Sequence, residues 1–379
     1  MKWERPIPVL LLVRELSAGG TERQLTETAR RLDRRDFSPH VGCFHSDGMR
    51  AQELQSAGVP IVRFPVRSFG SLSLLQGLRQ MKQYLASHRI GLVHTFDVPM
   101  TIFGVPAARL FGVPVVLASQ RAYRELTPPM YRTVLRMTDR MAHGIVVNCA
   151  AIREHLERDY GVPPSRIHLC YNGIDTTVFQ PAPQRSGSAD TAGEVTIGGV
   201  YALRPEKGLE VLMDAFAIVH TACPRTRLLI VGSGSMEAEL RKRASGYGLD
   251  AVCRFEPASP NVAEHLRDID IFVLPSRSEA LSNSLMEAMA CGCACIATNV
   301  GGNPELVTSG ETGMLFARDQ KEDLAQLLQL LVRDRDLRCK LGAAAADRIR
   351  RDFDAKDLGT RMGDIYRSVG CKSKRWAPG

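Results

Sequence analysis

The chain has 379 residues and a net charge of +8, with 44% hydrophobic and 24% charged residues. These values are typical of a soluble globular protein of two or three domains. They exclude a disulfide-stapled miniprotein, a disordered tail and a fibre. The excess charge is confined to the first half, because residues 1–180 hold 23 Lys and Arg against 15 Asp and Glu. We therefore expect this half to meet an acidic surface or an acidic substrate, with anionic lipid and nucleic acid as candidates.

The ten cysteines show no zinc-binding spacing. Cys291, Cys293 and Cys295 alternate as strand residues do, which fits either a soft-metal site or, as we favour, three small buried hydrophobes. No apolar stretch approaches the roughly 20 residues that cross a bilayer. The apolar run 7–13 has only seven residues, is interrupted by Pro8 and is ended by Arg14, so we expect no signal peptide. We therefore expect a cytoplasmic protein in a reducing compartment.

Short apolar runs alternate with amphipathic segments through the first half. The runs predict strands at 8–13, 40–44, 59–64, 91–96, 113–119 and 143–148, and the segments predict helices at 21–32, 49–58 and 73–88. Apolar strands flanked by helices indicate parallel strands that are covered on both faces. The first half is therefore predicted to be a doubly wound α/β sheet.

A second α/β series follows a segment rich in Pro, Gly, Ser and Ala, which is typical of an interdomain linker. Its predicted strands are 195–201, 227–232, 252–256, 269–275 and 293–298, its predicted helices lie near 208–221, 235–246 and 284–291, and residues 321–369 are mostly helical in pattern. We assign an N-terminal domain to 1–180, the linker to 181–194, a C-terminal domain to 195–354, and a final helix and tail to 355–379.

Ligands of open α/β sheets bind beyond the carboxyl ends of the strands, so residues that follow a strand are the candidate site residues. The richest such segment begins after the strand 269–275 and includes Glu279. Ser284 and Glu287 have capping-box spacing, which predicts a helix that starts near Ser284 and a diphosphate site at its N-terminus. Glu279 and Glu287 would then reach a sugar hydroxyl and a ribose. In the alternative interpretation, Glu287 only completes the capping box and Glu279 is exposed to solvent.

Two other strand ends carry candidate groups. Arg204 and Lys207 follow the first strand of the second series, where two cations beside a helix N-terminus suit a pyrophosphate. Gly19 and Gly20 follow the first strand of the chain, where paired glycines let the backbone approach a ligand. The alternatives are a solvated basic turn and a tight turn that needs glycine. The VGSG sequence at 231–234 lacks the third glycine of a dinucleotide-binding fingerprint, so nicotinamide binding is not favoured.

The basic half contains two clusters of arginines. Arg132, Arg136 and Arg140 are four residues apart and share one face of a helix predicted within 130–144. A solvated helix face is the plainer interpretation of this pattern, and docking to anionic lipid or capture of a lipid diphosphate is the functional one. The second cluster consists of Arg30, Arg31, Arg34 and Arg35.

Five segments, taken in order, resemble family 4 of the retaining glycosyltransferases, the group 1 glycosyltransferases. They are SAGGTE (17–22), RIHLCYNGID (166–175), LRPEKGLEVLMDAF (203–216), LLIVGSGSMEAEL (228–240) and SEALSNSLMEAMACGCACIATNVGGNPELV (278–307). The last contains the family's two glutamates, separated by seven residues, as Glu279 and Glu287. The resemblance covers most of the chain and is dense from 195 to 316. It implies the GT-B fold, in which two Rossmann-like, doubly wound domains face each other across a cleft and the last helix crosses back toward the N-terminal domain.

This resemblance implies roles for the candidate residues. Arg204 and Lys207 would neutralise the departing diphosphate and Glu279 would contact the donor sugar, and these three would be the catalytic residues. Fixed cations suit this step because negative charge develops on the leaving group. The donor would also be bound by Glu287, at its ribose, and by Gly19, Gly20, Ala280, Leu281, Ser282, Asn283 and Ser284. With two cations present no metal is required, so no metal and no other cofactor is expected.

The chain departs from the family at two places. Ala202 stands where the family often has Arg, and Arg204, on the same face of the strand, would take its part. Many members have a His-x-His element where this chain has His94 and Phe96, followed by Asp97. We expect His94 and Asp97 near the acceptor or the sugar. The alternative for His94 is a hydrogen-bonded histidine at a strand end.

The resemblance thus implies a retaining, metal-independent transferase that moves a sugar from a UDP- or GDP-linked donor to a glycan or polyprenyl-diphosphate-linked acceptor. Arg121, after the strand 113–119, is a further acceptor-site candidate, with a surface arginine as the alternative. The expected setting is polysaccharide or glycolipid biosynthesis, in the cytoplasm or peripherally at the inner face of the membrane. A nucleotide-sugar epimerase of the same fold is the first alternative. A basic nucleic-acid-binding protein is the remote one, because no helix-turn-helix, zinc or RNA-binding signature is found.

Overall fold

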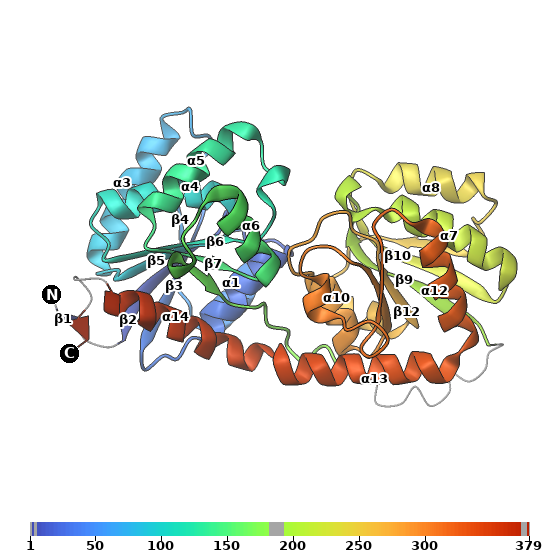
Figure 1. The fold of residues 1–379 in the computed structure, drawn as a ribbon. Helices are drawn as coiled ribbons and strands as arrows, with labels where there is room; N and C mark the ends of the chain where they lie inside the picture. Colours follow the sequence, from blue (N-terminus) through green and yellow to red (C-terminus); the bar gives the residue numbers. More distant parts are fainter. Residues whose placement is uncertain (1, 4–5, 182–192, 373–376, 379) are drawn as a thin grey trace. The chain divides into compact units, whose positions relative to one another are not determined.

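The computed structural model describes residues 2–3, 6–181, 193–372 and 377–378. The chain divides into two compact units (Figure 1). Unit 1 consists of residues 1–173 and 355–379, and unit 2 consists of residues 174–354. The expected linker, 181–194, lies outside the described residues except for positions 181, 193 and 194.

Unit 1 is built from a central sheet and the helices that connect its strands. The strands are β2 (Ile7–Leu12), β3 (Phe37–Cys43), β4 (Ile61–Arg63), β5 (Leu92–Thr95), β6 (Val115–Gln120), β7 (Gly144–Val147) and β8 (Ile167–Leu169), with a separate pair of β1 (Lys2–Trp3) and β15 (Ala377–Pro378). The helices are α1 (Gly20–Arg31), α2 (Met49–Ser56), α3 (Ser73–Ser87), α4 (Val98–Leu110), α5 (Pro129–Met141), α6 (Ala150–Tyr160) and α14 (Leu358–Lys372). Single 3-10 turns occur at η1 (Arg124–Leu126), η2 (Pro164–Arg166) and η4 (Ala355–Asp357).

Unit 2 repeats this plan. Its strands are β9 (Val195–Ala202), β10 (Thr226–Ser233), β11 (Cys253–Glu256), β12 (Ile271–Leu274), β13 (Ala294–Thr298) and β14 (Met314–Phe316). Its helices are α7 (Leu209–Ala222), α8 (Glu237–Gly246), α9 (Val262–Arg267), α10 (Asn283–Ala290), α11 (Asn303–Leu306), α12 (Lys321–Arg333) and α13 (Arg335–Asp352), with the 3-10 turn η3 (Pro205–Lys207) between β9 and α7.

Both sheets are parallel and have the strand order of a Rossmann fold. The unit 1 sheet runs β4-β3-β2-β5-β6-β7-β8, and the unit 2 sheet runs β11-β10-β9-β12-β13-β14. In each sheet the order reverses beside the first strand, between β2 and β5 in unit 1 and between β9 and β12 in unit 2. The crevice beyond this reversal is where open α/β sheets bind ligands.

The hydrophobic pattern of β2 explains how unit 1 is layered. Val9 and Leu11 enter a core shared with α1, α2 and α14, whereas Leu10 and Leu12 enter a second core shared with α3 and α4. Because successive strand residues point to opposite faces, a strand that is apolar at every position is buried on both sides. Figure 1 shows α14 on one side of this sheet and α3, α4 and α5 on the other.

Unit 2 is covered in the same way. Helix α7 packs against α8 and α12, and α10 packs against α9 and α13. In Figure 1, α7, α8 and α12 lie on one side of the sheet and α10 on the other. The predicted fold class, two Rossmann-like doubly wound α/β domains, is therefore confirmed. No helix among the described residues combines the length and the apolar character that a membrane span requires.

Candidate functional site

The strand order of unit 2 brings its two main sequence-predicted segments together. The turn with Arg204 and Lys207 follows β9, and the loop with Glu279 follows β12. Strands β9 and β12 pair in parallel, so both loops leave the same edge of the sheet at the point where the strand order reverses. Residues 72 positions apart thereby become neighbours.

Lys207 and Glu279 form an ion pair within this edge. Lys207 Nζ lies 2.6 Å from Glu279 Oε2, and the two side chains are 19% and 13% exposed. The hydroxyl of Ser276, which is fully buried, donates to the same carboxylate oxygen at 3.0 Å. These two of the three predicted catalytic groups thus neutralise each other.

Arg204 is placed differently from Lys207. Its side chain is 67% exposed, and its nearest carboxylate, that of Glu206, is 4.0 Å away. Arg204 precedes η3 in an extended conformation, with φ −123° and ψ 156°. The guanidinium is therefore accessible at the same strand end as the Lys207–Glu279 pair.

A close backbone contact fixes the start of α7 against the end of β12. Gly208 has φ +62°, and a Cβ on this residue would lie 2.3 Å from the carbonyl oxygen of Pro275. Both the left-handed conformation and this approach exclude larger residues. Arg277, which sequence reasoning did not single out, reinforces the contact by donating its backbone N–H to Glu206 O at 2.8 Å.

The structure corrects the predicted start of α10. The helix begins at Asn283 with Ser282 as its N-cap, and the Ser282 hydroxyl accepts from the backbone N–H of Leu285. The predicted capping box of Ser284 and Glu287 is not formed, because the cap lies two residues earlier. A serine cap at either position gives the same kind of signal in the sequence, which explains the error.

Glu287 is 4% exposed and lies in the buried face of α10. The other predicted donor-binding residues occupy the first turn of α10 and the loop before it. Ala280 and Leu281 are buried, Ser282 is the cap, and Asn283 and Ser284 are half-buried. The carbonyl of Ala280 accepts from the Gly302 N–H at 2.7 Å, so the loop after β13 braces this segment.

The two glycines of VGSG serve packing in this edge of the sheet. A Cβ on Gly232 would lie 1.9 Å from the Tyr201 carbonyl oxygen, and one on Gly234 would lie 2.3 Å from the Leu203 carbonyl oxygen. The glycines thus let the end of β10 run close beside the segment that leads to Arg204. This geometry accounts for both glycines without a dinucleotide.

In unit 1, Gly19 and Gly20 stand at the N-terminus of α1, after β2. The carboxylate of Glu22 folds back over Gly19, since a Cβ on Gly19 would lie 2.1 Å from Glu22 Oε2. Burial raises the pKa of Glu22, and the nearby Glu15 raises it further, against its backbone hydrogen bond and the charges of Arg50 and Arg121. A ligand that reached this backbone would have to displace the Glu22 side chain.

His94 lies in the interior of unit 1, where its side chain is not exposed to an acceptor. The residue is fully buried in β5, and its two ring nitrogens meet the hydroxyls of Tyr366 at 2.8 Å and Ser119 at 2.9 Å. Burial, with a smaller effect of Arg121, lowers its pKa to about 3. These contacts favour the alternative for His94, a hydrogen-bonded histidine at a strand end, over a direct contact with the acceptor.

Asp97 lies at the carboxyl end of β5 and is the N-cap of α4. It accepts from the Met100 N–H at 2.8 Å and from the Arg14 N–H, which ties the ends of β5 and β2 together. Burial raises its pKa to about 6, although both backbone hydrogen bonds oppose this shift. Asp97 thus holds the edge of the sheet beside the strand reversal of unit 1.

Arg121 follows β6 at the same edge. Its guanidinium donates to Asn172 Oδ1 and lies 5.6 Å from the centre of the Phe96 ring. Burial lowers the pKa of Arg121 to about 10, so the side chain remains charged at neutral pH. By contrast, Arg124, which sequence reasoning missed, is 1% exposed and fully bound to Asp139 through two bonds of 2.8 Å.

The three closely spaced cysteines belong to the core. Cys291, Cys293 and Cys295 are buried, and Cys293 Sγ lies 3.2 Å from the Leu266 carbonyl oxygen. Within the described parts of the chain, no three His, Cys, Asp or Glu side chains are grouped so that they could hold a metal ion. The small-hydrophobe reading fits this placement.

The two halves of the chain match two family models. The model described as "Glycosyltransferase Family 4" matches residues 18–178, and the model described as "Glycosyl transferases group 1" matches residues 184–348. The chain belongs to the family 4, group 1 glycosyltransferases. The expected enzyme class is thereby confirmed.

Curated relatives of this glycosyltransferase carry several different activities in their names. The chain is 29% identical to a D-inositol 3-phosphate glycosyltransferase of Arthrobacter sp. over 72% of this chain and 70% of that protein. It is 27% identical to an alpha-maltose-1-phosphate synthase of Mycolicibacterium smegmatis over 73% of this chain and 79% of that protein.

Solved structures share the fold of this glycosyltransferase. HepE of Anabaena, in complex with UDP-glucose, has a TM-score of 0.83 and 21% identity over 96% of this chain and 100% of that chain. A sucrose-phosphate synthase of Thermosynechococcus elongatus has a TM-score of 0.81 and 21% identity over 97% of this chain and 100% of that chain. The glycosyltransferase thus has the GT-B fold.

Proposed function

We propose that this enzyme transfers a sugar from a UDP- or GDP-linked donor to a glycan or lipid-linked acceptor, with retention at the anomeric carbon and without a metal ion. The observation that carries the proposal is the Lys207–Glu279 pair, 2.6 Å apart, with the exposed Arg204 at the same strand end. A carboxylate accepts hydrogen bonds from sugar hydroxyls, and two neighbouring cations bind a diphosphate. The two kinds of group side by side therefore suit a nucleotide sugar.

The leaving group explains why cations belong at this edge. Glycosyl transfer builds negative charge on the departing diphosphate, so fixed positive charge there acts on the transition state more than on the ground state. Lys207 and Arg204 supply that charge in the proposal, and the first amides of α10 add the positive end of a helix dipole. Structural neighbours were solved with UDP or UDP-glucose bound, which supports a nucleotide-sugar donor.

In this proposal, donor binding opens the Lys207–Glu279 pair. Lys207 turns to the diphosphate and Glu279 accepts from hydroxyls of the donor sugar. Departure and attack take place on the same face of the sugar within an ion pair, and the donor phosphate accepts the proton of the acceptor hydroxyl. Glu279 as a covalent nucleophile is less favoured, because its expected place is beside other hydroxyls of the sugar.

We place the acceptor on unit 1, where Arg121 and Asp97 lie at the carboxyl edge of the sheet. Arg121 keeps its charge and suits an anionic group such as a lipid diphosphate. The names of two relatives, D-inositol 3-phosphate glycosyltransferase and alpha-maltose-1-phosphate synthase, each contain a phosphorylated molecule. An acceptor on a lipid carrier would place the enzyme in polysaccharide or glycolipid biosynthesis at the cytoplasmic face of a membrane.

The surface of α3, α4 and α5 supports peripheral contact with anionic lipid in this proposal. Residues 54–141, which contain these helices, hold eleven Lys and Arg but three acidic residues, Asp97, Glu125 and Asp139. The exposed large hydrophobic side chains of this segment are Leu72, Leu75, Leu110, Leu126, Met130 and Met137. Positive charge together with exposed apolar side chains is the combination that favours an anionic bilayer surface.

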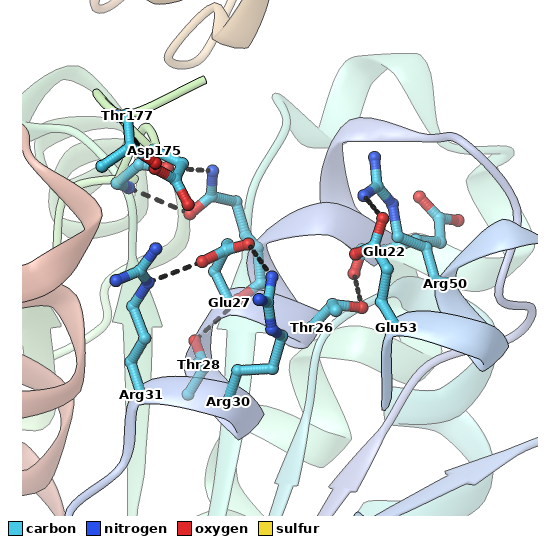
Figure 2. A network of polar contacts seen from close by, with 12 residues as sticks. Glu22, Thr26, Glu27, Thr28, Arg30, Arg31, Arg50, Glu53, Asp175 and Thr177 are labelled. Carbon is cyan, nitrogen blue, oxygen red and sulfur yellow. Dashed lines mark hydrogen bonds and ion pairs between the residues drawn. The ribbon is translucent and has the colours of Figure 1, made fainter. Parts of the chain in front are cut away.

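The two arginine clusters differ in their partners. Among the described residues, no carboxylate lies within ion-pair distance of Arg132, Arg136 or Arg140 on α5. In the second cluster, Glu27 binds both Arg30 and Arg31, at 3.1 and 2.7 Å (Figure 2). Asp33 likewise binds Arg35 at 2.7 Å. We therefore assign the lipid contact to α5 and not to the second cluster.

Sedimentation with vesicles that contain anionic phospholipid tests this contact. The triple replacement of Arg132, Arg136 and Arg140 by Gln should reduce vesicle binding, since each basic residue contributes about 1 kcal/mol near such a surface. Replacement of Arg30, Arg34 and Arg35 by Gln removes the same charge and serves as the control. Equal loss in both variants, or no binding by the wild type, would refute a contact through α5.

The transfer reaction is tested by release of free nucleoside diphosphate from UDP- and GDP-linked sugars, with glycan and lipid-linked acceptors, in the presence of EDTA. The wild type should release one nucleotide in an acceptor-dependent manner, and NMR of the product should show the anomeric configuration of the donor. Glu279→Gln should abolish release, whereas Glu311→Gln, on an exposed turn of unit 2, should not. Interconversion of the donor sugar without release would instead support the epimerase alternative.

A further inference from the structure

Arg277 connects four segments around the candidate donor site of unit 2. Its guanidinium donates to Asp319 Oδ1 at 2.7 Å, to Pro205 O at 3.3 Å and to a carboxylate oxygen of Glu210. Its backbone N–H donates to Glu206 O at 2.8 Å. One residue of the β12 loop is therefore attached to η3, to the first turn of α7 and to the turn after β14.

The placement of these bonds relates Arg277 to the two proposed catalytic groups. Lys207 is the last residue of η3, and Arg277 binds the carbonyl groups of both residues before it in that turn. Glu279 lies two residues after Arg277 in the same loop. The 2.6 Å contact between Lys207 and Glu279 thus joins two short segments that Arg277 fastens to each other.

Other features of the η3 turn do not attach it to the β12 loop by a side chain as Arg277 does. The turn η3 is a single 3-10 turn without a side-chain cap, and Arg204 before it is exposed. Gly208 brings the backbone of α7 against Pro275, but glycine itself supplies no side chain to hold the approach. Arginine suits the task because its planar fork donates in several directions at once, which lysine does not do.

We propose that Arg277 is a positioning residue for the transfer reaction, which holds Lys207 and Glu279 in register at the donor. The proposal rests on the function proposed above. Arg277 acts through Lys207: when the η3 turn is released from the β12 loop, the ammonium no longer stands at a fixed place relative to the departing diphosphate. Small displacements of a catalytic group have large effects on rate.

Kinetics of single and double variants test this role. Arg277→Ala should lower kcat/KM for the donor about tenfold to a hundredfold, and Arg277→Lys should retain part of the activity. In a Lys207→Ala background the same Arg277→Ala change should have little further effect, because the group it positions is absent. Arg318→Ala is the matched control, since Arg318 Nε lies 3.5 Å from Asp319 Oδ2 and, among the described residues, Arg318 forms no ion pair with η3.

Amide hydrogen exchange gives a readout that does not depend on turnover. The N–H groups of Lys207, Gly208 and Arg277 are bonded within these two segments, to Arg204 O, Pro205 O and Glu206 O. Arg277→Ala should increase their exchange rates, and Arg318→Ala should leave them unchanged. Glu210→Gln and Asp319→Asn, which each remove the negative charge of one acceptor, should give smaller increases in the same amides if Arg277→Ala itself folds poorly.

The outcomes separate the two proposals. Wild-type kinetics in Arg277→Ala, an equal loss with and without Lys207, or unchanged exchange at these amides would overturn the role of Arg277. A wild type that turns over no nucleotide sugar would contradict the proposed function instead. In that case the exchange data would still decide whether Arg277 fastens the η3 turn to the β12 loop.

Discussion

Lys207 and Glu279 can neutralise each other only because two loops from neighbouring strands approach each other closely. This approach depends on Gly208, which has φ +62°. A Cβ at this position would lie 2.3 Å from the carbonyl oxygen of Pro275. A side chain at this position would push α7 away from β12 and so separate the two charged groups. The geometry of the site therefore depends on Gly208, although this residue has no side chain that could contact a ligand.

Gly208→Ala should lower the free energy of unfolding by clearly more than a left-handed alanine costs elsewhere, which is about 1 kcal/mol. Gly248→Ala is the matched control, because Gly248 has φ +69° but nothing lies within 4 Å of its Cβ position. Urea unfolding of both variants measures the difference. Equal losses would show that the contact with Pro275 does not constrain this position.

His94 should make stability dependent on pH. Burial lowers its pKa from 6.5 to about 3, so between these values the unfolded chain binds a proton that the folded chain does not. The contribution of His94 is therefore fully present above pH 6.5 and is lost as the pH falls toward 3, with a slope of up to about 1.4 kcal/mol per pH unit.

His94→Gln should flatten the decline in stability between pH 6.5 and 4, as measured by urea unfolding across this range. His40, whose pKa burial lowers to about 4, adds a decline of the same sign in both proteins. The comparison must therefore be the difference between variant and wild type. His45→Gln, at an exposed position, should keep the wild-type slope. A variant as steep as the wild type would mean that His94 is accessible to protons in the folded state.

Residues that follow strands were predictable, and residues that act through local geometry were not. Arg204, Lys207 and Glu279 stand out because charged groups that follow buried strands of a parallel sheet must gather at one edge. Arg277 also follows a buried strand, but its partners, like those of Glu22, are fixed only by how the loops fold, so their contacts could not be predicted. The same holds for Arg124, whose partner Asp139 lies 15 residues away on a helix face.

At the scale of elements, α10 joins the core of unit 2 to the edge of the sheet where we propose that the donor binds. Its buried face packs toward α9 and α13, and its first turn faces the loop that contains Glu279. Ser282 caps this turn, which leaves the remaining first amides of the helix at the edge where the proposed diphosphate binds.

Ser282→Ala should reduce the free energy of unfolding by about 1 kcal/mol, the usual effect of removing a serine cap. Ser278→Ala, in the same loop but outside the cap, should change stability by less than about 0.5 kcal/mol. Thermal unfolding of both variants measures the effect. If Ser284→Ala were as destabilising as Ser282→Ala, the helix would start where the sequence pattern placed it.

Some elements carried too weak a pattern to be predicted. Helix α4 contains Pro99, Gly104 and Pro106 and is buried at most positions, so it shows neither helical propensity nor a polar face. Strands β8 and β14 have three residues each, which is too short for a periodic signal. Long apolar strands such as β2 and β6, by contrast, were found at nearly their observed bounds.

At the scale of the whole molecule, alternation of strands and helices was enough to predict two doubly wound units. The strand order within each sheet was not contained in that pattern, although the order decides which loops meet. The predicted boundary after residue 354 agrees with the division into units, whereas the predicted end of the first domain at residue 180 lies seven residues beyond residue 173. Residues 355–379 cluster with 1–173, and this grouping includes Tyr366 of α14, which is buried in the unit 1 core and bonded to His94.

We propose that unit 2 binds a nucleoside diphosphate through Lys207. Thermal unfolding with UDP, GDP, ADP and CMP in EDTA tests this binding most directly. One diphosphate at a hundred times its Kd should stabilise the wild type by about 2.7 kcal/mol. The shift should be much smaller in Lys207→Ala and unchanged in Lys242→Ala, a control on the exposed face of α8. No shift with any of these nucleotides, or an equal shift in Lys207→Ala, would contradict the account.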